Sequence, residues 1–253
     1  MIPIVDDHCH LWFPPISEEV EEYIERNKKE GVIAIINNSS SIEQVKRSLE
    51  FKDSQGILFN AFGIHPIHAL EARQEDLLFI EKNIDKAIAI GEVGLDYANL
   101  KEGEKEKQLE LFEFFIRLSE KTQKPLIVHS RAAAREVVEL LESSNARVVM
   151  HYFAGRKWLV KKILDHGWML SIPTNIVKLQ QLQDNVALAP MDQLLTETDA
   201  PWLSPYKDKY PNESRYIIET LRKIAEIKNL ALGEVAEQIV RNFEETYKVK
   251  LER

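Results

Sequence analysis

Histidine and acidic residues stand at the ends of short apolar runs in this sequence. The first run, IPIVD (2–6), is followed by His8 and His10 on either side of Cys9. Alternate side chains of a strand point the same way, so both imidazoles face one side, with Cα atoms about 7 Å apart. Both rings can then reach a single ion at about 2.0–2.1 Å from each nitrogen. The pair alone is equally consistent with two packed histidines, and Cys9 is expected to be a small apolar residue.

Four further runs end in the same kinds of residue. Glu92 follows AIAIG, His129 follows LIV, His151 follows RVVM, and Asp199 follows QLLTET. Taken singly, each residue could be a helix cap, a core histidine or the start of a turn. If these alternatives held at every strand end at once, several buried polar groups would lack a partner, which is costly. The pattern therefore predicts that the strand ends meet around metal ions.

The number of potential ligands exceeds what one closed zinc site requires. It favours two divalent ions about 3.5–4 Å apart that share a carboxylate and a water. Glu92, on a middle strand, is the candidate bridging ligand. Asp199 is both a candidate ligand and the candidate general base that accepts the proton of that water. This is hydrolytic chemistry.

Parallel βαβ units would bring these strand ends together. Eight apolar runs alternate with helical segments, as in an α/β protein with a parallel sheet. The predicted strands are 2–6, 32–37, 57–62, 87–92, 126–129, 147–151, 168–172 and 193–198. Eight such units in 253 residues fit a single (β/α)8 barrel of the TIM type, whose active sites lie at the carboxyl ends of the strands. No linker divides the chain, so we expect one domain over 1–253.

The helical segments show ordinary amphipathic patterns. Ser41 with Gln44 predicts a capping box at the start of a helix. Leu109, Phe112 and Ile116 predict the buried stripe of a helix over 101–122, and the apolar residues from Leu232 to Phe243 predict a packed last helix.

Composition restricts the partners. The chain has a net charge of −8, so a protein that binds nucleic acid with its whole surface is excluded, and an anionic substrate needs a local basic patch or metal ions. A single cysteine cannot form an internal disulfide. The start MIPIVDDHCH has no signal-peptide pattern and no apolar run is long enough to span a membrane, so we expect a cytoplasmic protein that binds no membrane.

The motifs resemble those of the TatD family of metal-dependent hydrolases, within the amidohydrolase-like barrels. Six segments carry the resemblance, in the family's order and spacing: DDHCHL (6–11), GIHP (63–66), GEVGLDY (91–97), PLIVHSR (125–131), HYFAG (151–155) and ETDAPWLSP (197–205).

The resemblance implies two divalent metal ions, Mg²⁺, Mn²⁺ or Zn²⁺. His8 and His10 would bind one ion with Glu92 and Asp199, and His129 and His151 would bind the second with Glu92. It also implies a deoxyribonuclease with 3′-to-5′ exonuclease activity on DNA, with no protein partner predicted. His65 would lie on the substrate side.

Two positions depart from the family pattern. Trp12 replaces the usual Asp or Asn, and KDKYPNESR (207–215) lacks the usual glycine and final proline. Basic residues that follow the later strands are candidate substrate contacts, above all Arg131, Lys207 and Lys209, with Arg135, Arg156, Lys157 and Arg215 on the same predicted rim. Trp12 and Trp202 are candidates for stacking on a base, and packing against the underside of the loops is an equally good interpretation of both.

Two alternatives remain open at this point. The same metal site could hydrolyse a small phosphotriester, lactone or amide, because the fold does not determine the substrate. A barrel that keeps metal for structure alone would have a closed, four-coordinate site, which the excess of candidate ligands disfavours.

Overall fold

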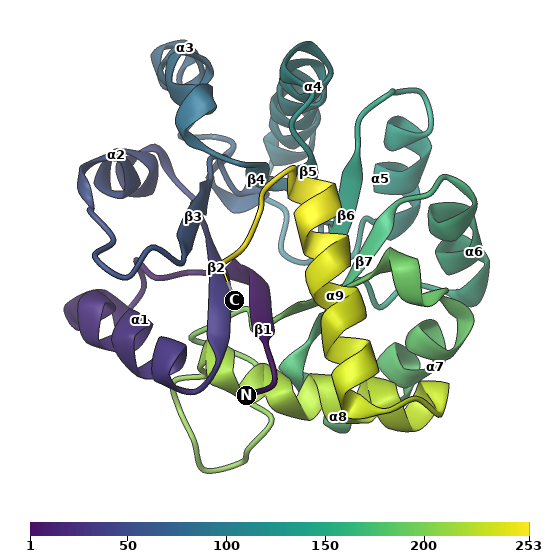
Figure 1. Ribbon diagram of the computed structural model, residues 1–253. Coiled ribbons are helices and arrows are strands. Elements are labelled where there is room, and N and C mark those ends of the chain that lie inside the picture. Colours follow the sequence, from purple (N-terminus) through teal and green to yellow (C-terminus); the bar gives the residue numbers. More distant parts are fainter. Residues whose placement is uncertain (253) are drawn as a thin grey trace. The chain divides into compact units, whose positions relative to one another are not determined.

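The computed structural model describes residues 1–252, and within them strands and helices alternate along the chain (Figure 1). The strands are β1 (Ile4–Cys9), β2 (Val32–Asn38), β3 (Leu58–Ala61), β4 (Ile90–Gly94), β5 (Leu126–His129), β6 (Val148–His151), β7 (Met169–Pro173) and β8 (Leu194–Glu197). The α-helices are α1 (Val20–Lys29), α2 (Ile42–Glu50), α3 (Gln74–Asn83), α4 (Glu104–Thr122), α5 (Ala134–Leu141), α6 (Lys157–Asp165), α7 (Gln180–Leu188), α8 (Ile217–Lys228) and α9 (Leu232–Tyr247).

Short 3-10 helices join several of these elements. They are η1 (Ile16–Glu18), η2 (Pro66–His68), η3 (Ile84–Lys86), η4 (Thr174–Val177), η5 (Met191–Gln193) and η6 (Ser214–Tyr216). The described chain divides into two compact units, each built from separate stretches of sequence. The first unit comprises 1–37, 52–59 and 169–253, and the second comprises 38–51 and 60–168.

The first unit contains parallel strands from both ends of the chain. β7 pairs with β8 and β1 pairs with β2. A parallel bridge between Cys9 and Ala200 brings the ends of β1 and β8 together. Helices α8 and α9 pack on β1 and β8, and α9 is the yellow helix that runs along β1 in Figure 1. The residues that follow β1 and β8 therefore lie side by side.

The second unit repeats this arrangement with the middle strands. β4 pairs with β5 and β5 pairs with β6, both in parallel. Gly94 lies opposite His129, and Ala61, the last residue of β3, forms a parallel bridge with Ala89. Helix α4 packs against β4 and β5. The carboxyl ends of these strands are thus neighbours.

The predicted strands are present, with shifted ends. β1 extends to Cys9, so His8 lies inside the strand and His10 directly follows it. β4 begins at Ile90 and ends at Gly94, which places Glu92 in the middle of the strand. The apolar run that starts at Ala87 did not reveal this shift, because pairing with β5 begins only where Ile90 lies opposite Leu126.

The predicted helix patterns are largely confirmed. Ser41 caps α2 by accepting the Gln44 amide, while the Gln44 side chain accepts the amide of Ser40. In α4 the buried stripe runs through Leu111, Phe112, Phe115 and Ile116, and Leu109 lies at its edge. Among residues 1–252, no helix combines the length and the apolar character that a membrane span needs.

Candidate metal centre

One group of potential ligands lies in the first unit, where β1 and β8 end. The Nε2 atoms of His8 and His10 are 3.1 Å apart. Asp199 Oδ1 lies 3.7 Å from His8 Nε2 and 3.4 Å from His10 Nε2. Ligands about 2.0–2.1 Å from a tetrahedral ion lie about 3.3 Å from one another. The spacing of these three atoms therefore fits a single divalent ion.

The backbone holds this group in place. The Asp199 amide donates to the carbonyl of His8 at 2.9 Å, and the His10 amide donates to the carbonyl of Ala200 at 2.8 Å. Asp199 has a φ of 55°, a left-handed conformation that aspartate tolerates better than most residues. The turn at Asp199 is thereby fixed against the end of β1.

A buried carboxylate supports the same turn from behind. Asp6 accepts the Thr198 amide, the Thr198 hydroxyl and the Ser214 hydroxyl. Burial raises the pKa of Asp6 to about 7, although the hydrogen bonds from Ser214 and Thr198 act to lower it. The Thr198 hydroxyl also accepts the Ala200 amide at 3.0 Å. Asp6 therefore positions the segment that carries Asp199.

The neighbouring Asp7 faces a different set of partners. Its carboxylate accepts hydrogen bonds from Ser171 and from Tyr247 in α9. Burial, and then the charge of Glu197, raises the pKa of Asp7 well above its usual value. The first unit thus holds a buried cluster of acids directly beside the ligands.

A second group of potential ligands lies in the second unit, around Glu92. Its Oε1 atom is 2.8 Å from His129 Nδ1, 3.6 Å from His65 Nε2 and 3.7 Å from His151 Nε2. Glu92 and His151 are buried. The group combines a carboxylate with imidazole nitrogens, which are ligands that divalent transition metals accept.

One ring nitrogen of His65 accepts a backbone hydrogen bond. Its Nδ1 accepts the amide of Ile67 at 3.2 Å. In the neutral ring the proton then sits on Nε2, the nitrogen nearer Glu92. His65 is thus set up as a donor, whereas a metal ligand needs an unprotonated nitrogen.

Asp96 joins this group, and sequence reasoning did not single it out. Its Oδ2 lies 3.0 Å from His129 Nε2, and its backbone amide and carbonyl are both bound by the Gln108 side chain. Burial alone would lower the pKa of His129, but the hydrogen bonds with Asp96 and Glu92 outweigh burial and raise it. The signal was present in the sequence as an acid four residues after Glu92.

Comparison with known proteins decides the family. The model of TatD-related DNases matches residues 5–248.

This chain belongs to the TatD-related DNase family.

Relatives in this family are similar over their whole length. A Bacillus subtilis protein named uncharacterized metal-dependent hydrolase YabD is 30% identical over 97% of this chain and 99% of its own. A human protein named deoxyribonuclease TATDN3 is 30% identical over 95% of this chain and 93% of its own.

A solved structure has the same fold. The structure of YJJV, a TatD homologue from Escherichia coli, has a TM-score of 0.90 with 24% identity and covers 99% of this chain and 100% of that one. The predicted (β/α)8 class is therefore confirmed. The chain is a metal-dependent hydrolase of the TatD family.

The structure places the predicted metal ligands of this TatD protein in the two groups described. His8, His10 and Asp199 lie together in the first unit, and Glu92, His129 and His151 lie together in the second. Cys9 is buried, as expected, and its thiol donates to the Ile36 carbonyl. Burial raises the pKa of this thiol, so it is poorly suited to be a thiolate ligand.

The predicted basic substrate contacts have varied surroundings. Arg131 and Lys207 are exposed. Lys209 lies over the rings of Tyr206 and Tyr216 and lines a pocket of about 440 Å³ with Met1, Ile2 and Ile4. That pocket adjoins the start of β1, whereas His10 follows its end.

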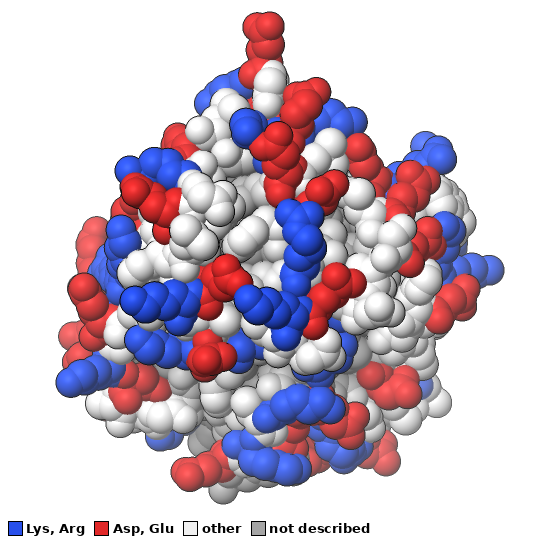
Figure 2. All heavy atoms as spheres, turned by 90° about the horizontal axis from the view of Figure 1, so that it is seen from above, with Lys and Arg blue, Asp and Glu red and all other residues white. Residues whose placement is uncertain are grey.

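Ion pairs involve two other residues of the predicted basic rim. Arg135 pairs with Glu139 and Arg215 pairs with Glu213. Figure 2 shows the same mixture, with Lys and Arg side chains next to Asp and Glu. Paired side chains contribute less to anion binding than the sequence suggested.

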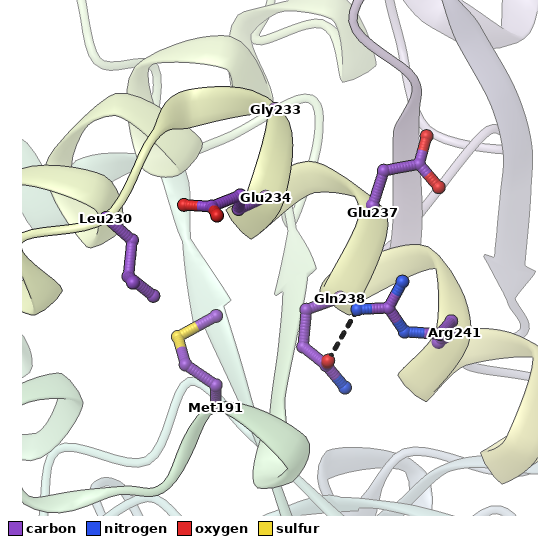
Figure 3. A pocket seen from close by; sticks show the side chains of 7 residues that line it. All are labelled: Met191, Leu230, Gly233, Glu234, Glu237, Gln238 and Arg241. Carbon is purple, nitrogen blue, oxygen red and sulfur yellow. Dashed lines mark hydrogen bonds between the residues drawn. The ribbon is translucent and has the colours of Figure 1, made fainter.

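A separate pocket of about 470 Å³ lies at the start of α9 (Figure 3). Met191 and Leu230 give it an apolar side, Glu234 and Glu237 add carboxylates, and Arg241 donates to Gln238. Met191 precedes β8 whereas Asp199 follows it, so this pocket lies at the opposite end of the strand from the ligands.

Proposed function

We propose that this TatD protein hydrolyses phosphodiester bonds of DNA with two divalent metal ions and removes nucleotides from 3′ ends. The observation that carries the proposal is the spacing of His8, His10 and Asp199, whose ligand atoms lie 3.1–3.7 Å apart. The family match and the human relative named a deoxyribonuclease support DNA as the substrate.

Six residues are the proposed metal ligands: His8, His10, Glu92, His129, His151 and Asp199. Glu92 keeps its predicted role as the bridging carboxylate. Divalent cations bound there would lower the pKa of water and stabilise charge on a phosphoryl oxygen. The mixture of imidazole and carboxylate favours Zn²⁺ or Mn²⁺ over Mg²⁺, which prefers oxygen ligands.

Asp199 is the proposed general base. Its side chain is 16% exposed, so a water molecule can approach the carboxylate. The bond from the Asp199 amide to His8 and the bond from the His10 amide to Ala200 hold the backbone around it. Its Oδ1 faces the two histidines, which places the proposed base beside the proposed metal ligands.

His65 is the proposed donor to the substrate. The bond from Ile67 fixes the proton of the neutral ring on Nε2, where it can stabilise a phosphoryl oxygen that gains charge. Arg131 and Lys207 remain proposed phosphate contacts. Lys209 is not proposed as a phosphate contact, because its side chain lies over two tyrosine rings beside the start of β1.

A nuclease assay tests the proposal. Single-stranded DNA labelled at its 5′ end is incubated with the protein and Mg²⁺, Mn²⁺ or Zn²⁺ in turn. We expect a ladder that shortens from the 3′ end, and no ladder with Asp199→Asn. Asp192→Asn is the matched control, since Asp192 is an exposed acid at the other end of β8.

Other products would contradict the proposal in distinct ways. Internal cuts without a ladder would support nuclease activity but contradict exonuclease activity. Hydrolysis of a phosphotriester or a lactone without any cleavage of DNA or RNA would establish the small-molecule alternative.

A further inference from the structure

An exposed aromatic surface adjoins the first ligand group. The ring centroids of Phe13 and Trp202 are 5.1 Å apart, and each lies 5.6 Å from the ring of His10. Trp202 is 42% exposed, and Phe13 is partly exposed. We call Phe13 and Trp202 the aromatic platform. One of its neighbours, His10, is a proposed metal ligand.

The platform is attached rigidly to the ligand group. The Trp202 amide donates to the carbonyl of Asp199 at 2.9 Å. The Leu203 carbonyl, next along the chain, accepts the Thr174 hydroxyl at 2.8 Å. The Tyr210 hydroxyl donates to the carbonyl of Pro14, which joins the segments that carry the two rings. The backbone that carries the indole is therefore tied directly to Asp199.

The exposure of this indole calls for an explanation. Trp12 is only 6% exposed, so the fold buries one of the two tryptophans near the ligands and leaves the other accessible. A large apolar ring that stays exposed beside a reactive centre is typical of a binding surface. Its position next to His10 and Asp199 indicates that the reacting molecule itself covers it.

We propose that the aromatic platform stacks on the nucleobase of the 3′-terminal nucleotide while its phosphodiester lies at the ligands. This inference rests on the proposed function and names the part of the substrate that is recognised. Stacking on aromatic side chains tolerates any base, because every base presents a π-face. It also supplies affinity that a chain of net charge −8 does not gain from its overall field.

The proposal predicts that a DNA end without a terminal base is a poor substrate. The test compares two oligonucleotides that differ only at the 3′ end, one with a normal nucleotide and one with an abasic tetrahydrofuran residue. For the wild type we expect kcat/KM to be about 5- to 150-fold lower on the abasic end, the factor that corresponds to about 1–3 kcal/mol of stacking.

Substitution of Trp202 separates stacking from a structural role. Trp202→Ala should lower kcat/KM on the normal end by a similar factor and leave the abasic end nearly unchanged, and Trp202→Phe should restore most of the loss. Trp158→Ala is the matched control, because Trp158 is a 45% exposed indole in α6. An equal loss on both ends, with a lowered melting temperature, would overturn the proposal.

A binding measurement decides the inference without any cleavage. Tryptophan fluorescence is recorded while dAMP or 2-deoxyribose 5-phosphate is added to the wild type and to Trp202→Phe. We expect dAMP to bind more tightly and to quench only the wild type. If the protein cleaves no DNA, the proposed function fails, and equal binding of the two phosphates would independently reject the platform.

Discussion

Thr198 donates two hydrogen bonds to Asp6, one from its amide to Oδ1 at 2.9 Å and one from its hydroxyl to Oδ2 at 2.7 Å. The pair joins the residue before Asp199 to β1, the strand that contains His8 and precedes His10. Both residues are fully buried, so solvent does not replace these bonds when they are lost.

Removal of the Thr198 hydroxyl should loosen the first ligand group. Thr198→Val keeps the volume but removes one of the hydrogen bonds to the Asp6 carboxylate and the hydroxyl that accepts the Ala200 amide. We expect a loss of about 1–3 kcal/mol in the free energy of unfolding, together with weaker metal binding, measured by denaturation and by metal titration.

Thr196 provides the matched control. It is equally buried in β8, and its hydroxyl donates to the carbonyl of Val5. Thr196→Val should cost similar stability without weakening metal binding. Equal loss of metal affinity in both variants would show that Thr198 has no special role.

The ionisation of Asp6 should make the stability of the metal-free protein depend on pH. Its pKa rises from 3.8 to about 7 on folding because burial penalises the charged form. The folded state then binds the proton more tightly, so this contribution to stability is complete below pH 3.8 and is lost as the pH rises through about 7.

The comparison of wild type with Asp6→Asn isolates this effect. The difference in their free energies of unfolding, measured in EDTA from pH 4 to pH 8, should fall as the pH rises, by on the order of a few kcal/mol. Asp7 should leave a remaining slope of the same sign in the variant, since its pKa is also raised. If the free energies of unfolding of the two proteins changed in parallel with pH, Asp6 would not be the group responsible.

Chelation should abolish activity and leave the fold intact. The turn that carries Asp199 is held by Asp6, Thr198 and Ser214, all buried and hydrogen-bonded. We expect an unchanged far-UV circular dichroism spectrum in EDTA and a melting temperature about 5–10 °C lower than with metal at a hundredfold excess over Kd. Unfolding by EDTA would instead indicate a structural metal.

Asp96 should affect metal affinity and activity through its contact with His129. Outer partners that orient a metal-binding histidine typically change metal affinity or activity by about 10–100-fold when removed. Asp96→Asn should show a loss of this size in both measurements. Asp85→Asn, which changes an exposed acid of the same unit, is the control and should behave as the wild type.

The grouping of the six proposed ligands could be predicted from the sequence, because each lies within or shortly after an apolar run that forms a strand. The exact end of β4 was not predictable, since alternation of apolar residues does not reveal where pairing with β5 begins. Asp96 was missed because an acid after Gly94 and Leu95 is equally typical of a loop.

The residues that hold the Asp199 turn in place could not be predicted from the sequence for a different reason. Asp6 and Ser214 are 208 residues apart, and no local pattern connects the serine at the start of η6 with an aspartate in β1. Trp12 and Trp202 looked alike in the sequence, since both adjoin ligand motifs. Only the packing around them shows that one is core and the other is accessible.

The distance along the chain between β1 and its partners also has a consequence for biosynthesis. His8 and His10 leave the ribosome well before Asp199 and the supporting Ser214, because Asp6 and Ser214 are 208 residues apart. A nascent chain that has not yet reached Asp199 therefore carries an incomplete set of ligands. The three proposed ligands of this group can hold an ion together only after the β8 segment has been synthesised.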